Sequence, residues 1–425
     1  MDSPKPPSSE LGSWKEIAQH LGVTVRTAQK WGAVRGLPVK RAAGQKGRVW
    51  ATTEELDRWQ RQTLQPPRFW ASLAFARWTS IVASALLLIE VGVLAGLYAQ
   101  QLLKGPPSRM LHELSSLIVT DAQGRELWRK TFDDGFRSGE TPERKLAFKG
   151  AWFGDLDGDG HIELLYIHNP AATDLTANTV YCFSDRGDVK WRFEPGHVVR
   201  TPHETIPPPF VADALAVIGE GGKQKAVVVT SHHPTFHPSQ VALLSPSGKL
   251  LGEYWHSGRL PRLEIVDLDG DGTPEILLGG ISAGYRSATL VVLDPAAVRG
   301  ASVETEAPED QIVGFAPAAE KARLLFPPTC VNRALDRYNE VGWLTVRPNG
   351  LRVLVWERRV PMLSFASVTY ALDRNLRVTA VTASDRLRSL HRELEASGQL
   401  DHLLTEREVQ RWAEIRYLRG EVQPR

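Results

Sequence analysis

Residues 78–103 form an apolar run that constrains the fold of this 425-residue chain more than any other feature. The run holds 26 residues, Trp78–Leu103, and its only charged side chain is Glu90. A helix that spans a bilayer needs about 20 mostly apolar residues, so the run predicts one transmembrane helix. The 77 residues before it exclude a secretory signal peptide, and the mean hydropathy of −0.24 excludes a transporter with many spans. The alternative is a buried core helix of a soluble domain.

Glu90 lies near the middle of this run, where a carboxylate costs about 2.5–3.5 kcal/mol in a bilayer. The Leu, Ile and Val residues around it offset this cost. The carboxyl group is either protonated or hydrogen-bonded to a second copy of the helix, and the sequence leaves both interpretations open.

Charge is distributed unevenly on the two sides of the run. Residues 1–80 hold 13 basic and 6 acidic side chains, whereas residues 81–425 hold 38 basic and 43 acidic ones. A basic head on an acidic body predicts that the two halves meet different partners. Arg61, Arg68 and Arg77 precede the run closely, which favours a cytoplasmic head by the positive-inside rule.

The head, residues 11–62, shows a helical period that is broken by short turns. Ser13 and Thr24 are good N-caps for helices over WKEIAQHL and VRTAQKW, and Gly22 breaks the chain between them. Two short extended pieces around GQKG follow, and Thr53 then caps a third helix. Two helices joined by a short turn are the arrangement that places a helix in a DNA major groove. The alternative is a helical bundle whose charges are only solvated.

The stretches WKEIAQHLGVTVRTAQKW, GLPVKR and GQKGRVWAT resemble the winged helix-turn-helix domains of the excisionase and mercury-resistance-regulator (MerR) type. The resemblance implies that the head binds DNA, with phosphate contacts supplying most of the affinity. The residues implied are Arg26, Thr27, Gln29 and Lys30 on the recognition helix, and Lys40, Arg41, Lys46 and Arg48 in and around the wing.

Two acidic loops stand out in the body, DLDGDGHIE at 155–163 and DLDGDGTPE at 267–275. Each has Asp at positions 1, 3 and 5, Gly at position 6 and Glu at position 9. Carboxylates packed this closely repel each other unless a cation neutralises them, and oxygen ligands in a flexible loop favour Ca²⁺ over Mg²⁺. Position 12 holds Tyr166 or Leu278 where an EF-hand has Glu, and the flanks are strand-like.

These loops resemble the FG-GAP/VCBS repeat of integrin-type β-propellers, in which a calcium loop joins two strands of a blade. The resemblance implies two bound Ca²⁺ ions, with the backbone carbonyl of position 7 as one ligand. The first ion would be held by Asp155, Asp157, Asp159, His161 and Glu163, and the second by Asp267, Asp269, Asp271, Thr273 and Glu275. Calcium loops of this kind suit the millimolar concentrations outside a cell, which places the body outside.

A second repeat interleaves with the first. Trp128, Trp191 and Trp255 each close a pattern of strand, Gly turn and strand, and they lie 63 and 64 residues apart. A strand-rich repeat of this length is typical of propeller blades. Residues 210–233 keep the strands of the calcium repeat without its ligands, and the hairpin 368–383 is the expected terminal strand pair. Helices are expected from Ser384 onwards.

The sequence shows no catalytic constellation, so we expect no enzymatic activity. His232, His233 and His237 could ligate a transition metal, but a polar loop is the favoured interpretation of SHHPTFHP. Cys182 and Cys330 could pair outside the cytoplasm, although no spacing argument joins them. A propeller hydrolase or quinoprotein is a third class, for which the sequence offers no nucleophile or cofactor signature.

The sequence therefore predicts a multidomain bacterial protein of the inner membrane, with a cytoplasmic head and an extracytoplasmic body. Its parts are a small α winged helix-turn-helix head (11–62), a linker (63–77), a transmembrane helix (78–103), a mainly-β propeller-like domain (110–383) and a C-terminal helical extension (384–425). The predicted function is that of a membrane-anchored one-component transcriptional regulator, with DNA, the membrane, an external protein or glycan, and a second copy (homodimer) as partners. The alternative is a membrane-tethered envelope interaction or adhesion protein whose propeller binds proteins or glycans.

Overall fold

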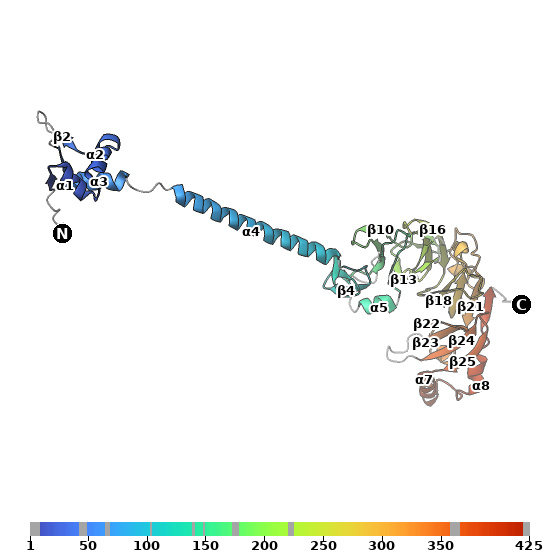
Figure 1. Cartoon of the computed structure of the whole chain (residues 1–425). Helices are drawn as coiled ribbons and strands as arrows, with labels where there is room; N and C mark the ends of the chain where they lie inside the picture. The colour runs from blue at the N-terminus through green and yellow to red at the C-terminus, as the bar shows by residue number, and fades with distance from the viewer. Residues whose placement is uncertain are drawn as a thin grey trace. The chain divides into compact units, whose positions relative to one another are not determined.

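The computed structural model describes two units, Met1–Leu102 and Leu103–Arg425 (Figure 1). Within them, the residues described are 9–41, 49–63, 69–102, 104–137, 141–147, 149–171, 178–219, 225–357 and 366–419. Each unit is treated by itself below.

The N-terminal unit begins with three short helices and three short strands. They are β1 (Glu10–Leu11), α1 (Trp14–His20), α2 (Val25–Val34), β2 (Lys40–Arg41), β3 (Val49–Thr52) and α3 (Thr53–Thr63). The side chain of Ser13 accepts a hydrogen bond from the backbone N–H of Glu16, and that of Thr24 from Thr27, so both residues cap helices. Thr52, and not Thr53, accepts the corresponding bond at the start of α3. The core of this region is formed by Ile17, Leu21, Leu37, Val49, Ala51, Leu56 and Trp59.

The expectation of a small α head of the winged helix-turn-helix class is wrong. The helices share this region with an antiparallel sheet of order β1-β3-β2, because residues before Ser13 pair with β3. Val25, the first residue of α2, is 37% exposed and does not belong to the core of this region. Residues 42–48, which contain most of the expected wing, lie outside the described residues.

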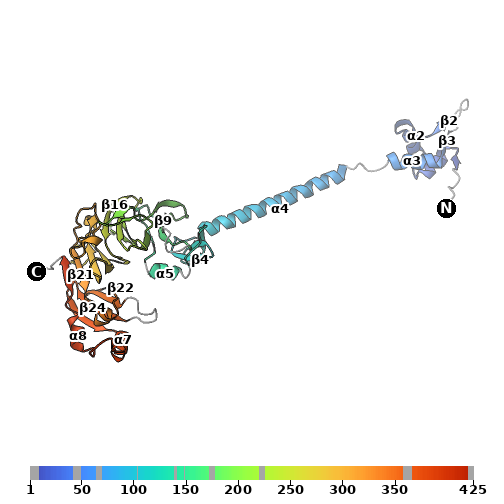
Figure 2. The same cartoon turned by 180° about the vertical axis from the view of Figure 1, so that it is seen from behind.

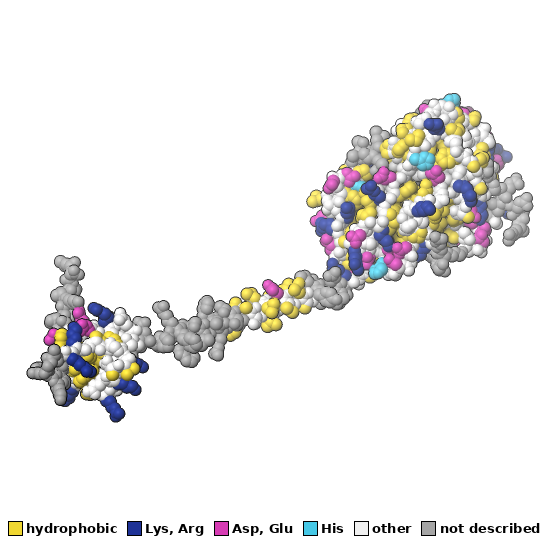
Figure 3. All heavy atoms as spheres, turned by 90° about the horizontal axis from the view of Figure 1, so that it is seen from above, with side chains coloured by type: hydrophobic (Ala, Val, Ile, Leu, Met, Phe, Trp, Pro, Cys, Tyr) yellow, Lys and Arg dark blue, Asp and Glu magenta, His cyan; other side chains and the backbone are white. Residues whose placement is uncertain are grey.

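Helix α4 (Phe69–Leu102) follows, and it corrects the membrane prediction. In the part of the chain that the structure describes, no helix combines the length and apolar character that crossing a bilayer requires. Within 81–96 the apolar side chains are exposed and are interrupted by Glu90 (Figure 3). The predictions of a transmembrane helix over 78–103 and of an inner-membrane location are therefore wrong.

The C-terminal unit is mainly β, and its described strands form five successive antiparallel sheets. Strands β4-β5-β6 form the first sheet, β7-β8-β9-β10 the second, β13-β14-β15-β16 the third, β17-β18-β19-β21 the fourth and β22-β23-β24-β25 the fifth. In every sheet, the strands neighbour each other in chain order, which is the order found in propeller blades. Figures 1 and 2 show the sheets following one another along the chain. The mainly-β, propeller-like architecture therefore follows from the strand order itself.

The bounds of these strands are as follows. They are β4 (Arg109–Glu113), β5 (Ser116–Thr120), β6 (Glu126–Thr131), β7 (Ala151–Gly154), β8 (Glu163–His168), β9 (Thr179–Phe183), β10 (Val189–Phe193), β13 (Val211–Ile218), β14 (Ala226–His232), β15 (Ser239–Leu244), β16 (Leu250–His256), β17 (Arg262–Val266), β18 (Glu275–Ser282), β19 (Ser287–Leu293), β21 (Ala322–Phe326), β22 (Asn339–Arg347), β23 (Gly350–Glu357), β24 (Ser367–Asp373) and β25 (Val378–Ala383). Smaller elements are α5 (Pro142–Ala147), the pair β11 (Val199–Arg200) and β12 (Thr205–Ile206), the 3-10 turns η1 (Pro295–Ala297) and η2 (Pro308–Asp310), and β20 (Gly300–Ala301), which extends the third sheet.

Neighbouring sheets pack face to face, because side chains alternate along each strand. In β8, Leu164 and Tyr166 join a hydrophobic cluster with the first sheet. Leu165 and Ile167, which point to the other face, join a cluster with the third sheet. Two further clusters bury the faces between the third and fourth sheets and between the fourth and fifth sheets. A continuous series of cores therefore holds the five sheets together.

The repeated tryptophans lock adjacent sheets to one another. A Cβ placed on Gly187, in the turn before β10, would lie 2.7 Å from the ring of Trp128 in β6. A Cβ on Gly248 would likewise lie 2.6 Å from the ring of Trp191 in β10. Both glycines also have positive φ, 87° and 81°. Trp128 and Trp191 therefore each pack against the turn glycine of the following sheet.

Three short helices and a last strand complete the C-terminal unit. They are α6 (Cys330–Ala334), α7 (Asp385–Ala396), α8 (Glu406–Arg411) and β26 (Arg416–Arg419). Ser384 caps α7, as the sequence predicted. The expected helical extension is shorter than predicted, since β26 pairs with β21 and returns the chain to the fourth sheet. Leu387, Leu390, Leu394, Val409 and Trp412 pack these helices against the core shared by the fourth and fifth sheets.

Candidate functional site

The two acidic loops occupy equivalent positions in two sheets. Loop 155–163 joins β7 to β8, and loop 267–275 joins β17 to β18. In each, the residue at position 9 pairs with the last residue of the preceding strand: Glu163 with Gly154, and Glu275 with Val266. The loops therefore form the connection between the first and second strands of a sheet, as the sequence predicted from their strand-like flanks.

Backbone N–H groups turn the carboxylates of the first loop inward. Asp155 accepts hydrogen bonds from Gly158 (2.7 Å) and Gly160 (3.2 Å), both of which have positive φ. Asp159 accepts one from His161 at 2.8 Å. Glu163 is buried, 1% exposed, and its Oε2 accepts the N–H of Leu156 at 2.8 Å. Local hydrogen bonding therefore holds this acidic turn together.

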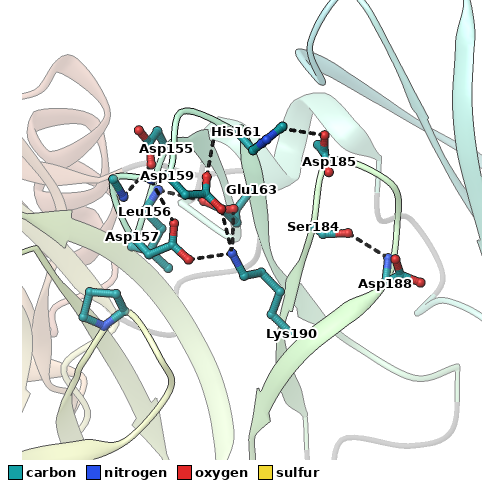
Figure 4. A network of polar contacts seen from close by, with 12 residues as sticks. Asp155, Leu156, Asp157, Asp159, His161, Glu163, Ser184, Asp185, Asp188 and Lys190 are labelled. Carbon is teal, nitrogen blue, oxygen red and sulfur yellow. Dashed lines mark hydrogen bonds and ion pairs between the residues drawn. The ribbon is translucent and has the colours of Figure 1, made fainter. Parts of the chain in front are cut away.

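A lysine ammonium lies among these carboxylates (Figure 4). Lys190 Nζ, from β10, lies 2.6 Å from Asp157 Oδ2, 2.9 Å from Glu163 Oε1 and 3.7 Å from Asp159 Oδ2. The hydrogen bond from Lys190 lowers the pKa of Asp157. Burial alone would lower the pKa of Lys190, but its bonds to Asp157 and Glu163 outweigh burial and raise it. The lysine thus partly neutralises the charge that a cation was expected to balance.

The second loop repeats this arrangement with another lysine. Lys321 Nζ lies 2.8 Å from Asp269 Oδ2 and also contacts Glu275 Oε1. Asp267 accepts from the N–H groups of Gly270 and Gly272 at 2.7 and 3.0 Å, as Asp155 does in the first loop. The bond from Lys321 lowers the pKa of Asp269. The second and fourth sheets therefore carry the same kind of acidic loop, each with a lysine ammonium as its partner.

The carboxylates suit a hard cation, but the ammonium groups compete for them. Carboxylate oxygens of Asp155, Asp157 and Glu163 lie within 4.8 Å of one another, and so do those of the three aspartates of the second loop. Asp159 and Glu275, which the sequence assigned as ligands, do not belong to these groups. His161 Nδ1 lies 3.0 Å from Asp185, and Thr273 donates its N–H to Asp271. Carboxylate oxygens are the ligand type that Ca²⁺ prefers, and each lysine contacts some of the oxygens that such an ion would need.

Sequence reasoning missed the two lysines. Lys190 follows Glu163 by 27 residues, whereas Lys321 follows Glu275 by 46. Because the two spacings differ, a comparison of the repeats does not align these lysines. Only the sheet pairing brings each one to its loop.

The structure describes six of the eight residues that the sequence assigned to DNA binding. Arg26, Gln29, Lys30 and Arg41 are exposed. Thr27 Oγ1 lies 2.8 Å from Thr24 Oγ1, at the start of α2. Lys40 pairs with Glu55 at 3.0 Å and lies over the ring of Trp50. Lys46 and Arg48 lie outside the described residues.

The remaining sequence candidates have structural roles or lie apart. His232 contacts Asp213 at 2.7 Å, and His233 accepts the N–H of Phe236, so these imidazoles belong to ion pairs and turns. Cys182 is buried in the second sheet and Cys330 lies on α6. Both are free cysteines, so the disulfide that the sequence had left open is not formed.

A pocket of about 680 Å³ opens at the edge of the sheets away from the second acidic loop. Strand β18 begins at that loop with Glu275 and ends near the pocket, which Ile281 lines. The other lining residues come from connections in three sheets and from η2: His237, Gly258, Ala283, Arg286, Asp310, Asp336, Arg337 and Tyr338. A volume of this size is typical of ligand-binding clefts.

One wall of this pocket is formed by contacts among Arg286, Asp336 and Tyr338. Arg286 pairs with Asp336 at 3.1 Å, and its guanidinium lies 4.8 Å from the ring centroid of Tyr338. Tyr338 is 39% exposed, and so is Val313 near η2, while Phe236 beside His237 is 43% exposed. Burial raises the pKa of Asp310, and nearby Glu309 and Glu304 act in the same direction. The pocket lining therefore combines a partly exposed tyrosine with side chains of both charges.

A buried ion-pair network fixes the segment that carries Asp310. Arg323 makes two bonds to Glu320, at 2.6 and 2.9 Å, and one to Glu304 at 3.3 Å. Glu304 is 2% exposed and also accepts from Ser302 at 2.7 Å. Gln311 bridges the backbone of Ser302 and Glu304. Because these groups are buried and paired, the pocket rim on this side is rigid.

No family model matches the chain, and a search of curated proteins finds no relative. The resemblances to the excisionase and MerR group and to FG-GAP/VCBS repeats are therefore not supported, and neither are the DNA-binding and transcription-regulation predictions. Solved structures that align with the chain include BBS1N in complex with ARL6DN (11% identity, 64% of this chain and 75% of that one, TM-score 0.28). BamB from Moraxella catarrhalis aligns at 8% identity over 66% of this chain and 74% of that one, with a TM-score of 0.25. The Dos1 propeller aligns at 9% identity over 66% and 63%, with a TM-score of 0.24. These TM-scores are low, so the propeller-like assignment rests on the strand order described above.

Proposed function

We propose that the C-terminal unit is a binding module that recognises another protein through the pocket lined by Arg286, Asp310 and Tyr338. The single observation that carries this proposal is the construction of the pocket. Connections from three consecutive sheets converge on it, while the sheets themselves form a continuously packed scaffold. Loops presented by a rigid scaffold are where binding residues concentrate in folded proteins.

The chemistry of the pocket wall supports a protein as the ligand. Tyr and Arg are enriched at protein interfaces, where they form the residues that dominate the binding energy. Here Arg286 and Tyr338 lie against each other, and the exposed aromatic side chain of Phe236 is next to the lining residue His237 in the sequence. A partner that covers this surface would bury aromatic and apolar area around a charged centre.

A selection experiment with the full chain tests this proposal. A library of random peptides is selected for binding, and the dissociation constant of each enriched peptide is then measured for Tyr338→Ala and Arg286→Ala. We expect each substitution to weaken binding at least about tenfold, since truncating a central Tyr or Arg of an interface costs on the order of 2 kcal/mol.

The matched controls lie on the fifth sheet, away from the pocket. Trp343→Ala removes an aromatic side chain that is 41% exposed, close to the 39% of Tyr338, and Arg352→Ala removes an exposed arginine of β23. Both controls should bind the selected peptides as the wild type does. Peptides whose binding is lost in the controls and retained in the pocket variants would contradict the proposal, and so would a selection that enriches none.

We also propose that the two acidic loops take up Ca²⁺ in exchange for their lysine contacts. The supporting observation is the donor set: clustered carboxylate oxygens whose charge one ammonium balances only in part. Bound Ca²⁺ would supply positive charge and coordination, and the carboxylates of Asp155, Asp157 and Glu163 in the first loop would hold it. Its role would be structural, at the turn that starts β8.

A further inference from the structure

A third cluster of side chains of the types that bind metals joins α6 to the C-terminal helices α7 and α8, apart from both acidic loops in the sequence. It contains Cys330 at the start of α6, His391 in α7, His402 between α7 and α8, and Glu408 in α8. One ligand atom from each, namely the thiol sulfur, two ring nitrogens and a carboxylate oxygen, lies within 4.8 Å of the other three. We call these four residues the C-terminal cluster.

His391 gives independent reason to expect a ligand here. Its imidazole is 0% exposed, and neither Nδ1 nor Nε2 has a hydrogen-bond partner among the described residues. Burying a polar group without a partner costs on the order of 1–3 kcal/mol, so native proteins rarely leave one in this state. The His402 ring lies 5.2 Å from the His391 ring, centroid to centroid, at an angle of 75°. A metal ion between the rings would satisfy one of the two buried nitrogens of His391.

We propose that the C-terminal cluster is a structural Zn²⁺ site. One thiolate, two imidazoles and one carboxylate form a four-ligand set that matches the tetrahedral preference of Zn²⁺. Ca²⁺ and Mg²⁺ prefer oxygen ligands, so the thiol and the imidazoles discriminate against them. With bond lengths of about 2.0–2.3 Å, the ligand atoms around Zn²⁺ lie roughly 3.3–3.6 Å apart, which small side-chain movements from the present arrangement would reach.

The surroundings of the cluster show what the metal does for the fold. Helices α6 and α8 have only 5 and 6 residues, too short to be stable alone. Their hydrophobic contacts, through Val331 and Val409, fix one side of each helix on the core. Zn²⁺ would join α6, α7 and α8 on the other side and release the thiol proton of Cys330 to solvent. Each ligand comes from a different local element, so the metal would cross-link the end of the chain.

The ligands also have supporting contacts of the kind that metal sites use. His402 Nδ1 lies 2.9 Å from Asp401 Oδ1, which leaves Nε2 facing Glu408 Oε2 at 3.3 Å. A carboxylate bonded to the second nitrogen of a ligating histidine fixes the orientation of its ring. The geometry therefore assigns Nε2 of His402 as the ligand atom.

The experiment uses the full chain, stripped of metal with a chelator and titrated with Co²⁺ and Zn²⁺. Co²⁺ bound to a thiolate gives an intense near-ultraviolet charge-transfer absorption, which oxygen-only sites do not give. We expect this absorption to saturate at one Co²⁺ per chain and to disappear when one equivalent of Zn²⁺ is added. Excess Ca²⁺ should leave it unchanged.

Four variants separate ligands from neighbours. Cys330→Ser should abolish the charge-transfer absorption, and Glu408→Gln should weaken Zn²⁺ binding at least tenfold. The matched controls are Cys182→Ala, a buried cysteine of the second sheet, and Glu406→Gln, an acidic residue of the same helix that is 71% exposed. Both controls should bind as the wild type does. Circular dichroism of each variant shows whether it is folded.

The proposal is overturned if the folded wild-type chain gives no thiolate absorption with Co²⁺, or if Cys330→Ser retains it. It is equally overturned if Cys182→Ala abolishes the absorption. Should Cys330→Ser not fold, Glu408→Gln decides, because this residue is partly exposed on α8 and its substitution leaves the core intact. Unchanged Zn²⁺ affinity in Glu408→Gln then refutes the assigned ligand set.

Discussion

Replacing Lys190 by methionine tests whether an ammonium group and Ca²⁺ compete for the first acidic loop. Methionine keeps the aliphatic length of lysine and removes the charge. Glu163 is 1% exposed and would lose one of its two hydrogen-bond partners in the loop, keeping only the N–H of Leu156. Breaking a fully buried ion pair costs about 3–5 kcal/mol. Because Lys190 is 29% exposed and Asp157 is 34% exposed, we expect Lys190→Met to lower the free energy of unfolding by a smaller amount, about 2–3 kcal/mol.

The assay is urea denaturation of the full chain with and without Ca²⁺, followed by circular dichroism. Without Ca²⁺, Lys190→Met should lower the free energy of unfolding by about the amount given above. Ca²⁺ at about 100 times its dissociation constant stabilises a folded protein by about 2.7 kcal/mol, so it should restore the variant. The wild type should gain less, since Ca²⁺ must first displace the ammonium.

Lys249→Met, in the exposed turn before β16, is the matched control. It should change neither the free energy of unfolding nor the gain in that energy when Ca²⁺ is added. The reasoning is refuted if Lys190→Met is as stable as the wild type without Ca²⁺. It is also refuted if Ca²⁺ stabilises the wild type and the variant equally, because the lysine would then not occupy the space of the cation.

Two further predictions follow from the packing and the buried charges. Gly187→Ala should destabilise the chain by about 2–4 kcal/mol in thermal unfolding, because Gly187 has a positive φ and contacts Trp128. Gly124 has a similar φ of 80° and open space around it, so Gly124→Ala should cost only about 1–2 kcal/mol. Equal losses of stability in the two variants would show that the tryptophan contact does not matter. Burial raises the pKa of Glu357 to about 8, above its ordinary 4.5, so the folded chain keeps a proton there that the unfolded chain has lost. The free energy of unfolding should therefore fall as the pH rises from about 4.5 to 8, by a total of about 5 kcal/mol, and Glu357→Gln should remove this part of the pH dependence. Melting temperatures of the wild type and the variant between pH 5 and pH 9 measure the difference. Parallel curves for the two proteins would contradict the prediction.

The strand-rich repeat could be predicted from the sequence because its signals are local. A turn glycine and a tryptophan recur at a fixed interval, and the acidic loops carry their own hydrogen-bond pattern, as at Asp155 and Asp267. These residues act within one sheet or between adjacent sheets. Local patterns of this kind determine both the blades and the position of each loop.

The partners of these loops could not be predicted, because they depend on pairing between distant strands. Lys190 and Lys321 reach equivalent loops from different sequence separations. The C-terminal cluster likewise joins Cys330 to residues of α7 and α8 that only tertiary packing brings together. Cysteine counting left open whether Cys182 and Cys330 pair, and the structure places these two residues in different elements.

The membrane and DNA-binding predictions failed for a different reason, since both rested on composition and pattern over a short stretch. An apolar run such as 78–103 indicates helix, and α4 is a helix, but no helix among the described residues combines the length and apolar character that a spanning segment needs. In the head, the winged helix-turn-helix class was inferred from the sequence pattern of two helices. That pattern gave no sign that β1 pairs with β3, because β1 has only 2 residues.

Recognition of a protein through the pocket is the central claim, and one comparison tests it most directly. Isothermal titration of a selected peptide into the wild type, Tyr338→Ala and Trp343→Ala measures what each exposed aromatic side chain contributes to binding. Our account predicts that the dissociation constant rises at least about tenfold for the pocket variant and stays unchanged for the variant of the fifth sheet. An equal effect of the two substitutions, or none in Tyr338→Ala, would contradict it.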